Sequence, residues 1–258
     1  GLNGGHVFMS TINQNAIIWS RGVPTSSTAQ AVPLYRSDDL GLTTALAPFS
    51  PTNTTITNLL PTMLYWENFD YQYSIDSITY VAMDTLKANS TIWVRSENGR
   101  YPTQYTLTED LNAGDTIKIK DKIFTRLFYG MKNTNVQNSV FMTNHGIQFT
   151  KPAVWYKILT PTGIPKSMGL SNDGDYFWVG TRDGKLYRLS NMNQAQDSLS
   201  ADITSDQCKI ITTEVLNFAG RVVTSIAVDP QNNDHVIVTL GNYGNDEYVY
   251  RSTNATSD

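Results

Sequence analysis

The sequence is poor in cysteine, histidine and long apolar runs. Its single cysteine among 258 residues, Cys208, forms no disulfide within the chain, so packing must hold the fold. The three histidines, His6, His145 and His235, show neither metal-ligand nor catalytic-triad spacing. No apolar run approaches the about 18 residues of a membrane span, and no glycine-rich phosphate loop is present. We therefore predict no metal site, no cofactor and no transmembrane segment.

Charge is also scarce. The formal net charge is −4, from 19 lysines and arginines against 23 aspartates and glutamates scattered along the chain. Nucleic acids and anionic membranes demand a basic face, so neither is expected as a partner. The start, GLNGGHVFMS, lacks the regions of a signal peptide, so any export signal has been removed or lies outside this sequence. Low charge with abundant Asn, Thr and Ser favours a secreted or cell-surface β-protein.

Strand patterns dominate what is present. Short apolar runs rich in Val, Ile, Tyr, Thr and Trp recur every 8 to 12 residues, separated by Gly, Asn, Asp and Pro. Windows with helical periodicity are almost absent. The sequence therefore predicts an all-β fold.

Two segments repeat one another. Ser167–Ser190 and Ser225–Ser252 each contain a strand that starts at Ser, an Asn/Asp turn, a second apolar strand, a glycine-containing hairpin and a third strand that ends in Tyr-Arg-Ser or Tyr-Arg-Leu-Ser. The extra length falls in a polar stretch after Ser190. Insertions between strands rather than within them are typical of a structural repeat.

Weaker copies of the second and third strands are predicted at His6–Arg21 and Ser139–Lys151, and terminal strands at Ala153–Leu159 and Lys209–Leu216. Four antiparallel strands per unit are typical of a β-propeller blade. A single twisted sheet cannot bury both faces, so blades stack on one another. We predict a partial propeller ring of such blades.

Residues 73–121 interrupt the repeat. STIWVRS and DTIKIKD alternate strictly between apolar and polar residues, which predicts a small β-sandwich-like module inserted between propeller parts at 1–72 and 122–258. The first unit begins at a predicted second strand and the last has no fourth strand. We expect the chain to be a piece of a longer propeller, or a ring that another segment completes.

The units at Ser167–Leu216 and Thr224–Thr253 resemble the sortilin-type and Asp-box repeat propellers, whose blades carry Ser-x-Asp-x-Gly-x-Thr-Trp between the third and fourth strands. RSTNATSD keeps the Arg-Ser-Thr entry but has no Gly or Trp, and neither has the equivalent YRLSNMNQ. IAVDPQNNDHVIVTL is similar to blades of large secreted or surface proteins of the Bacteroidetes, including ones exported by type IX secretion. The resemblance implies a propeller at the cell surface or outer membrane, and not one activity.

The resemblance also raises sialic acid hydrolysis, which uses an arginine cluster, a carboxylate-activated tyrosine and an acid. Glu247 and several tyrosines accompany the candidate arginines, which are Arg21, Arg126, Arg188, Arg221 and Arg251. Arg188 and Arg251 occupy the same repeat position, which favours a structural role. No catalytic residue is therefore assigned.

Other candidates each have a structural explanation. The turns Asn172–Asp175 and Asp229–Asp234 are rich enough in oxygen ligands for calcium, but Asn, Asp and Gly are also what tight turns require. Cys208, at a predicted strand start, is interpreted as a small buried hydrophobe. Sequons occur at Asn53, Asn89 and Asn254. The tryptophans are expected to pack between blades unless exposed, where they would stack on sugars; they are Trp19, Trp66, Trp93, Trp155 and Trp178.

Three functions remain open. The first is a non-enzymatic binding or scaffolding module that presents its loops and its insert to a protein or glycan at the cell surface. The second is a glycan-processing enzyme of the sialidase or lyase type, completed by further blades. The third is a component of an envelope complex, in which a partner chain covers the open blade edges.

Overall fold

The computed structural model describes residues 5–20, 34–42, 49, 51, 61–132, 137–242, 244 and 246–257. These residues form six small antiparallel sheets and no closed barrel. Helix is limited to η1 (Met192–Gln194), a 3-10 turn, and α1 (Ser198–Ala201). The all-β prediction is confirmed for this part of the chain.

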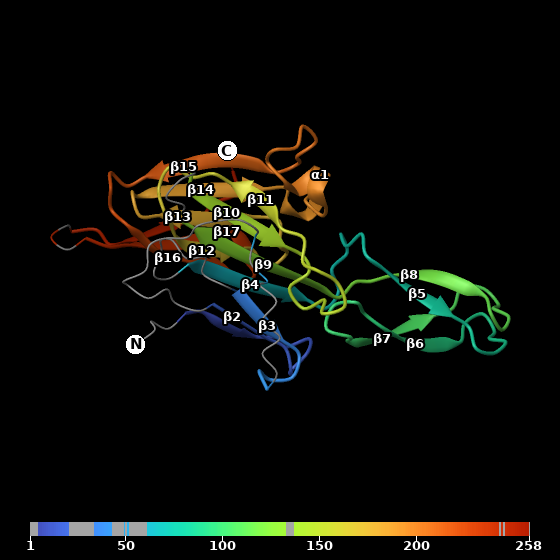
Figure 1. The fold of residues 1–258 in the computed structure, drawn as a ribbon. Coiled ribbons are helices and arrows are strands. Elements are labelled where there is room, and N and C mark those ends of the chain that lie inside the picture. Colours follow the sequence, from blue (N-terminus) through green and yellow to red (C-terminus); the bar gives the residue numbers. More distant parts are fainter. Residues whose placement is uncertain are drawn as a thin grey trace.

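Four of the sheets follow one another along the chain (Figure 1). The first sheet contains β1 (Val7–Met9), β2 (Ile17–Ser20) and β3 (Leu34–Ser37). The second contains β4 (Thr62–Asn68), β9 (Phe124–Met131), β10 (Ser139–Thr143) and β11 (Tyr156–Leu159). The third contains β12 (Pro165–Leu170), β13 (Phe177–Thr181), β14 (Lys185–Ser190) and β15 (Ile211–Asn217). The fourth contains β16 (Val223–Asp229), β17 (Asn232–Leu240) and β18 (Val249–Ser252).

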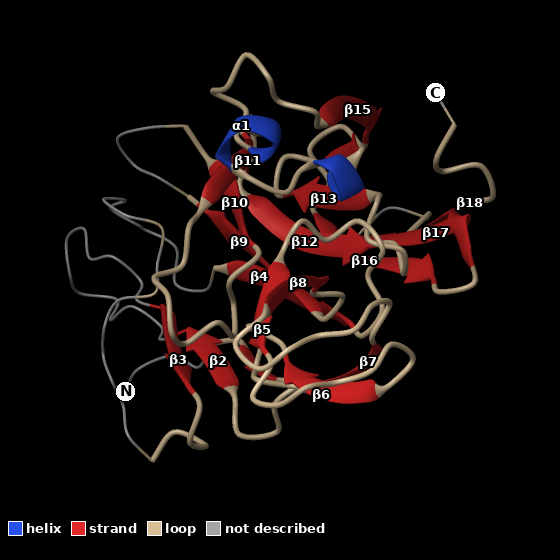
Figure 2. Ribbon diagram, turned by 90° about the vertical axis from the view of Figure 1, so that its right-hand side faces the viewer, coloured by secondary structure: helices blue, strands red, loops and turns tan. Residues whose placement is uncertain are grey.

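Three hydrophobic clusters join these sheets in the same order. Ile18 of the first sheet packs in a cluster with Leu127 of the second. Phe128 of the second stacks on Phe177 of the third, with ring centroids 4.0 Å apart. The third cluster joins Trp178 to the fourth sheet. Figure 2, seen from the side of the β5–β8 pair, shows the four sheets one after another from β2 and β3 on the left to β17 and β18 on the right.

Residues 73–121, here called the insert, lie between β4 and β9 and project away from the four sheets (Figure 1). They form two two-stranded sheets; the pairs are β5 (Ser77–Val81) with β8 (Thr116–Lys120) and β6 (Thr91–Arg95) with β7 (Pro102–Thr106). The alternation predicted for β6 and β8 is present, because Ile92, Val94 and Ile119 point into a separate hydrophobic cluster.

The structure corrects the first repeat unit. The strands at His6–Arg21 are the first and second strands of their sheet, not the second and third, because β2 continues its pairing with β3. The third strand, with the sequence Leu-Tyr-Arg-Ser, had been missed. Arg21 itself lies outside the described residues.

The prediction of two strands in Ser139–Lys151 is also wrong. Only Ser139–Thr143 is a strand, β10. The residues after it form a turn because other groups satisfy their main chain: Arg36 donates to His145 O and Gly146 O, and Gly99 N donates to Ile147 O. Cys208 also differs from expectation, since it is half-buried and precedes β15 rather than beginning it.

Candidate binding surfaces

Arg126, on β9, is fully buried and is used for structure. Its guanidinium donates to Gly174 O at 2.8 Å, to Met192 O at 2.6 Å and to the Tyr71 hydroxyl at 3.0 Å. Burial lowers the pKa of this guanidinium. The hydrogen bonds from Arg126 to the two carbonyls thus connect the second sheet to two turns of the third.

Arg188 lines an apolar pocket of about 460 Å³ between the third and fourth sheets, whereas Arg251 is exposed on β18 opposite Ile237, on the other face of the fourth sheet. Arg188 is 3% exposed and donates from Nη1 to Ala255 O at 3.0 Å and to Ser257 O at 2.5 Å. Arg221 lies in the loop between β15 and β16 and donates to Glu247 O. Arg126 and Arg188 therefore bind separate stretches of main chain, and the four candidate arginines that the structure describes do not assemble the arginine cluster of a sialidase.

Glu247, named with those arginines, does meet a tyrosine, Tyr250. The Tyr250 hydroxyl donates to Glu247 Oε2 at 2.8 Å. This hydrogen bond raises the pKa of Tyr250, which opposes formation of the phenolate that a nucleophile requires. The pair is exposed at the surface and supports no catalytic assignment.

The two acidic turns come together, although they are distant in sequence. Residues of both line a polar pocket of about 520 Å³, and Asn233 Nδ2 donates to Asp173 Oδ2 at 2.8 Å across it. The carboxylates already accept main-chain hydrogen bonds. Asp229 accepts from Gln231 N at 2.9 Å within its own turn, and Asp234 accepts from Thr256 N at 3.1 Å in the segment after β18. In the described part of the chain no group of three or more His, Cys, Asp and Glu side chains is placed to hold a metal ion.

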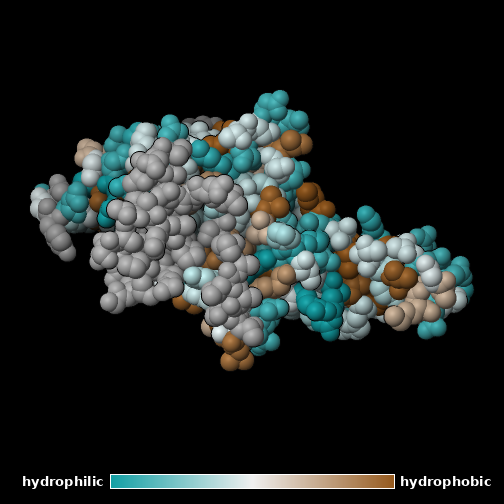
Figure 3. All heavy atoms as spheres, viewed as in Figure 1, coloured by the Kyte–Doolittle hydropathy of each residue, from teal (hydrophilic) through white to brown (hydrophobic). Residues whose placement is uncertain are grey.

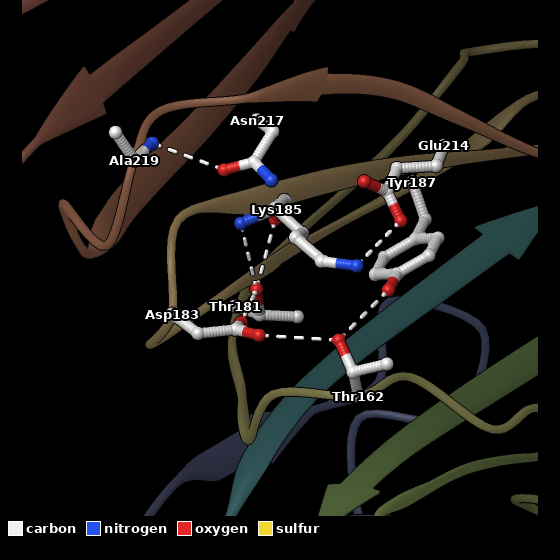
Figure 4. Close-up of polar contacts among 8 residues, drawn as sticks. All are labelled: Thr162, Thr181, Asp183, Lys185, Tyr187, Glu214, Asn217 and Ala219. Atoms are coloured by element: carbon white, nitrogen blue, oxygen red, sulfur yellow. Dashed lines mark hydrogen bonds and ion pairs between the residues drawn. The ribbon is translucent and has the colours of Figure 1, made fainter.

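A second charged cluster lies at the β13–β14 hairpin (Figure 4). Thr181 Oγ1 accepts from Lys185 N at 3.0 Å, and Thr162 Oγ1 donates to Asp183 Oδ2 at 3.1 Å. Lys185 Nζ reaches Glu214 of β15 at 2.9 Å, and this hydrogen bond raises the pKa of the Lys185 amine. A lysine held in its charged form is not a general base. The contact between Lys185 and Glu214 instead holds the hairpin against β15.

The tryptophans separate into packed and exposed. Trp178 is buried and Trp155 donates to Phe49 O at 2.8 Å, while Trp19 and Trp66 are half-buried. Trp93 is 64% exposed although it lies in the middle of β6. It is therefore the tryptophan to which the sugar-stacking alternative applies.

Trp93 lies at the centre of the β6–β7 strand pair. Its neighbours on β6 at positions 92 and 94 point into the core of the insert, so the indole must point outward. Gln104 lies directly opposite it on β7. The same outer face carries four more exposed side chains: Thr91, Arg95, Pro102 and Thr106. We call these six residues the Trp93 face.

The Trp93 face is mixed in polarity, because it combines the indole and Pro102 with amide, hydroxyl and guanidinium groups. The side of the insert that Figure 3 shows carries hydrophobic spots among hydrophilic residues. An aromatic ring amid amide, hydroxyl and guanidinium groups offers both stacking area and hydrogen bonds, which is the combination that a sugar ring requires.

No protein-family model matches the chain, and no curated protein matches its sequence. Among the described residues no helix is long and apolar enough to cross a bilayer.

Two signals were missed in the sequence. The segment from Ser37 to Thr43 reads Ser-x-Asp-x-Gly-x-Thr, which is the first seven positions of the Asp-box pattern. In its described part Ser37 Oγ accepts from Asp39 N at 3.2 Å and from Gly41 N at 2.9 Å. The second signal is Arg36, which precedes this segment in a Leu-Tyr-Arg sequence that repeats at Leu186–Arg188.

Proposed function

We propose that the chain is a non-enzymatic binding module of a secreted or cell-surface protein, built on stacked propeller blades, and that the Trp93 face binds a glycan. The observation that supports glycan binding is Trp93, an exposed indole at the centre of a face that also carries Gln104, Arg95 and two threonines. Burying an indole on a sugar ring gains apolar contact without desolvating a charge.

The stacking of the sheets supports the propeller scaffold. Each of the four sheets packs on the next through one cluster, in chain order. The Ser37–Thr43 segment stands after a third strand, which is where the Asp-box pattern belongs. Such a scaffold keeps the insert in a fixed position, so binding need not include the ordering of a flexible support.

The glycan-processing alternative has less support. It requires several arginines that face a substrate carboxylate, whereas Arg126 and Arg188 donate to main-chain carbonyls. Outer-membrane association and type IX export remain proposals that follow from the resemblance.

Affinity electrophoresis through gels that contain soluble polysaccharides tests the proposal. We expect at least one polysaccharide to retard the wild-type chain, and Trp93→Ala to abolish that retardation. Met83→Ala is the matched control, because Met83 is an exposed apolar residue of the insert, outside the Trp93 face. Equal mobility of the wild type and Trp93→Ala in every gel contradicts glycan binding at this face.

A further inference from the structure

One arginine recurs on the third strand of three sheets. Arg36 of β3, Arg188 of β14 and Arg251 of β18 each follow a tyrosine. Each also stands opposite an apolar residue of the preceding strand: Arg36 faces Ile18, Arg188 faces Trp178 and Arg251 faces Ile237. The three arginines are therefore on the same face of their sheets.

Two of the three bind the next sheet in the same way. Arg36 donates to His145 O at 2.8 Å and to Lys151 O at 2.9 Å, in the segment that follows the third strand of the second sheet. Arg188 donates to Ala255 O and Ser257 O, in the segment that follows the third strand of the fourth sheet. The contact is thus a repeated clamp from one sheet to the main chain of its successor.

Arg251 occupies the equivalent position on the fourth sheet. It is exposed and makes no hydrogen bond to any other described residue. Ile237 and Val249 lie beside it on the outer face of the fourth sheet and are 43% and 64% exposed. This face is the one that would meet a fifth sheet.

The first sheet exposes the face that points away from the second sheet. Val7 and Met9 are 63% and 62% exposed, and Trp19 stacks on Tyr35 with ring centroids 5.4 Å apart. Tyr35 occupies the position of Tyr187, which packs toward the second sheet from the third. The first sheet therefore exposes the face by which the third sheet contacts its predecessor.

We propose that the outer face of the fourth sheet receives the first sheet of a second copy of this chain. Arg251 then donates to main-chain carbonyls of the segment that follows β3, which also carries the exposed carboxylate of Asp38. The two faces are different surfaces of one chain, so the contact is head-to-tail, and in the proposed dimer each chain contributes one face to each of two reciprocal contacts. This inference concerns assembly and does not depend on Trp93.

Sedimentation velocity over a concentration series tests the assembly. We expect a mass twice the 28.8 kDa of one chain, reduced to one chain by Arg251→Glu and by Met9→Asp, which act on opposite faces. Lys118→Glu, an exposed charge reversal on the insert, should leave the dimer intact. A single-chain mass at every concentration, or a dimer that resists both variants, overturns the proposal and assigns the face to another partner.

A cross-link locates the contact. In a Cys208→Ser background, we expect a mixture of Asp38→Cys and Arg251→Cys chains to form a disulfide-linked pair on oxidation, and neither variant alone to do so to the same extent. Equal cross-linking of each variant alone and of the mixture contradicts the head-to-tail arrangement.

Discussion

Arg188 is a single charge buried between the third and fourth sheets, and its two carbonyl acceptors belong to the segment after β18. Hydrogen bonds from a charged donor in a buried site contribute more to stability than neutral ones. The recurring arginine therefore stabilises the junction between two sheets rather than one strand.

We predict that Arg188→Ala lowers the free energy of unfolding by about 2–4 kcal/mol, because the substitution removes a buried side chain and its two charge-assisted hydrogen bonds to the fourth sheet. Urea unfolding measures the change. Arg182→Ala, at an exposed position in the adjacent hairpin, should change stability by less than about 0.5 kcal/mol. Equal effects of the two substitutions would mean that the clamp adds nothing to stability.

His145 is the residue that should make stability depend on pH. Burial is the main cause that lowers its pKa below the usual 6.5. The unfolded chain then binds a proton more readily than the folded one, so stability is complete above about pH 6.5 and is lost as pH falls toward the lower folded pKa.

We expect the free energy of unfolding of the wild type to fall between about pH 7.5 and pH 5, and His145→Gln to show a smaller fall. His6, whose pKa is also lowered by burial, retains part of the dependence. Urea titrations at both pH values provide the comparison. An equally steep loss in His145→Gln would exclude this histidine as the source.

At the scale of elements, the third and fourth sheets approach each other closely at Gly180. A Cβ on Gly180 of β13 would lie 2.4 Å from Val223 Cγ1 and 2.5 Å from Ser167 Oγ. The absence of a side chain at Gly180 therefore permits the packing of β16 against β12 and β13.

Gly180→Ala is predicted to destabilise the chain by about 1–3 kcal/mol, because the added methyl group overpacks this junction. Thermal and urea unfolding report the loss. Gly146→Ala is the control, since its Cβ would meet Tyr65 Cε2 at an ordinary 3.4 Å. Tolerance of alanine at position 180 would contradict the close approach of the two sheets.

Strand periodicity in the sequence predicted much of the fold. The alternation in β6 and β8 and the apolar runs of β13 and β17 are local signals, and these strands lie where they were expected. Their pattern arises because each strand has at least one face in a hydrophobic cluster.

The failures have tertiary causes. The turn after β10 has an apolar pattern, but Arg36 and Gly99 satisfy its main chain from distant segments, which no local pattern reveals. The meeting of the two acidic turns likewise depends on packing of the third sheet on the fourth. The exposure of Trp93 follows from strand register, since a shift of one residue would turn the indole inward.

At the scale of the whole molecule, the four stacked sheets and the insert have separate hydrophobic cores and different roles in this account. Three clusters and the arginine clamps fix the sheets to one another, whereas the insert has its own core and projects from them. A partner can therefore occupy the Trp93 face without rearranging the stack.

The most direct test of this account is hydrogen–deuterium exchange of the intact chain with and without a polysaccharide that retards it in the gel. We predict that the polysaccharide slows exchange in β6 and β7 and leaves β13 to β18 unchanged. Protection confined to the pocket between the third and fourth sheets, with none in the insert, would contradict the assignment of binding to the Trp93 face.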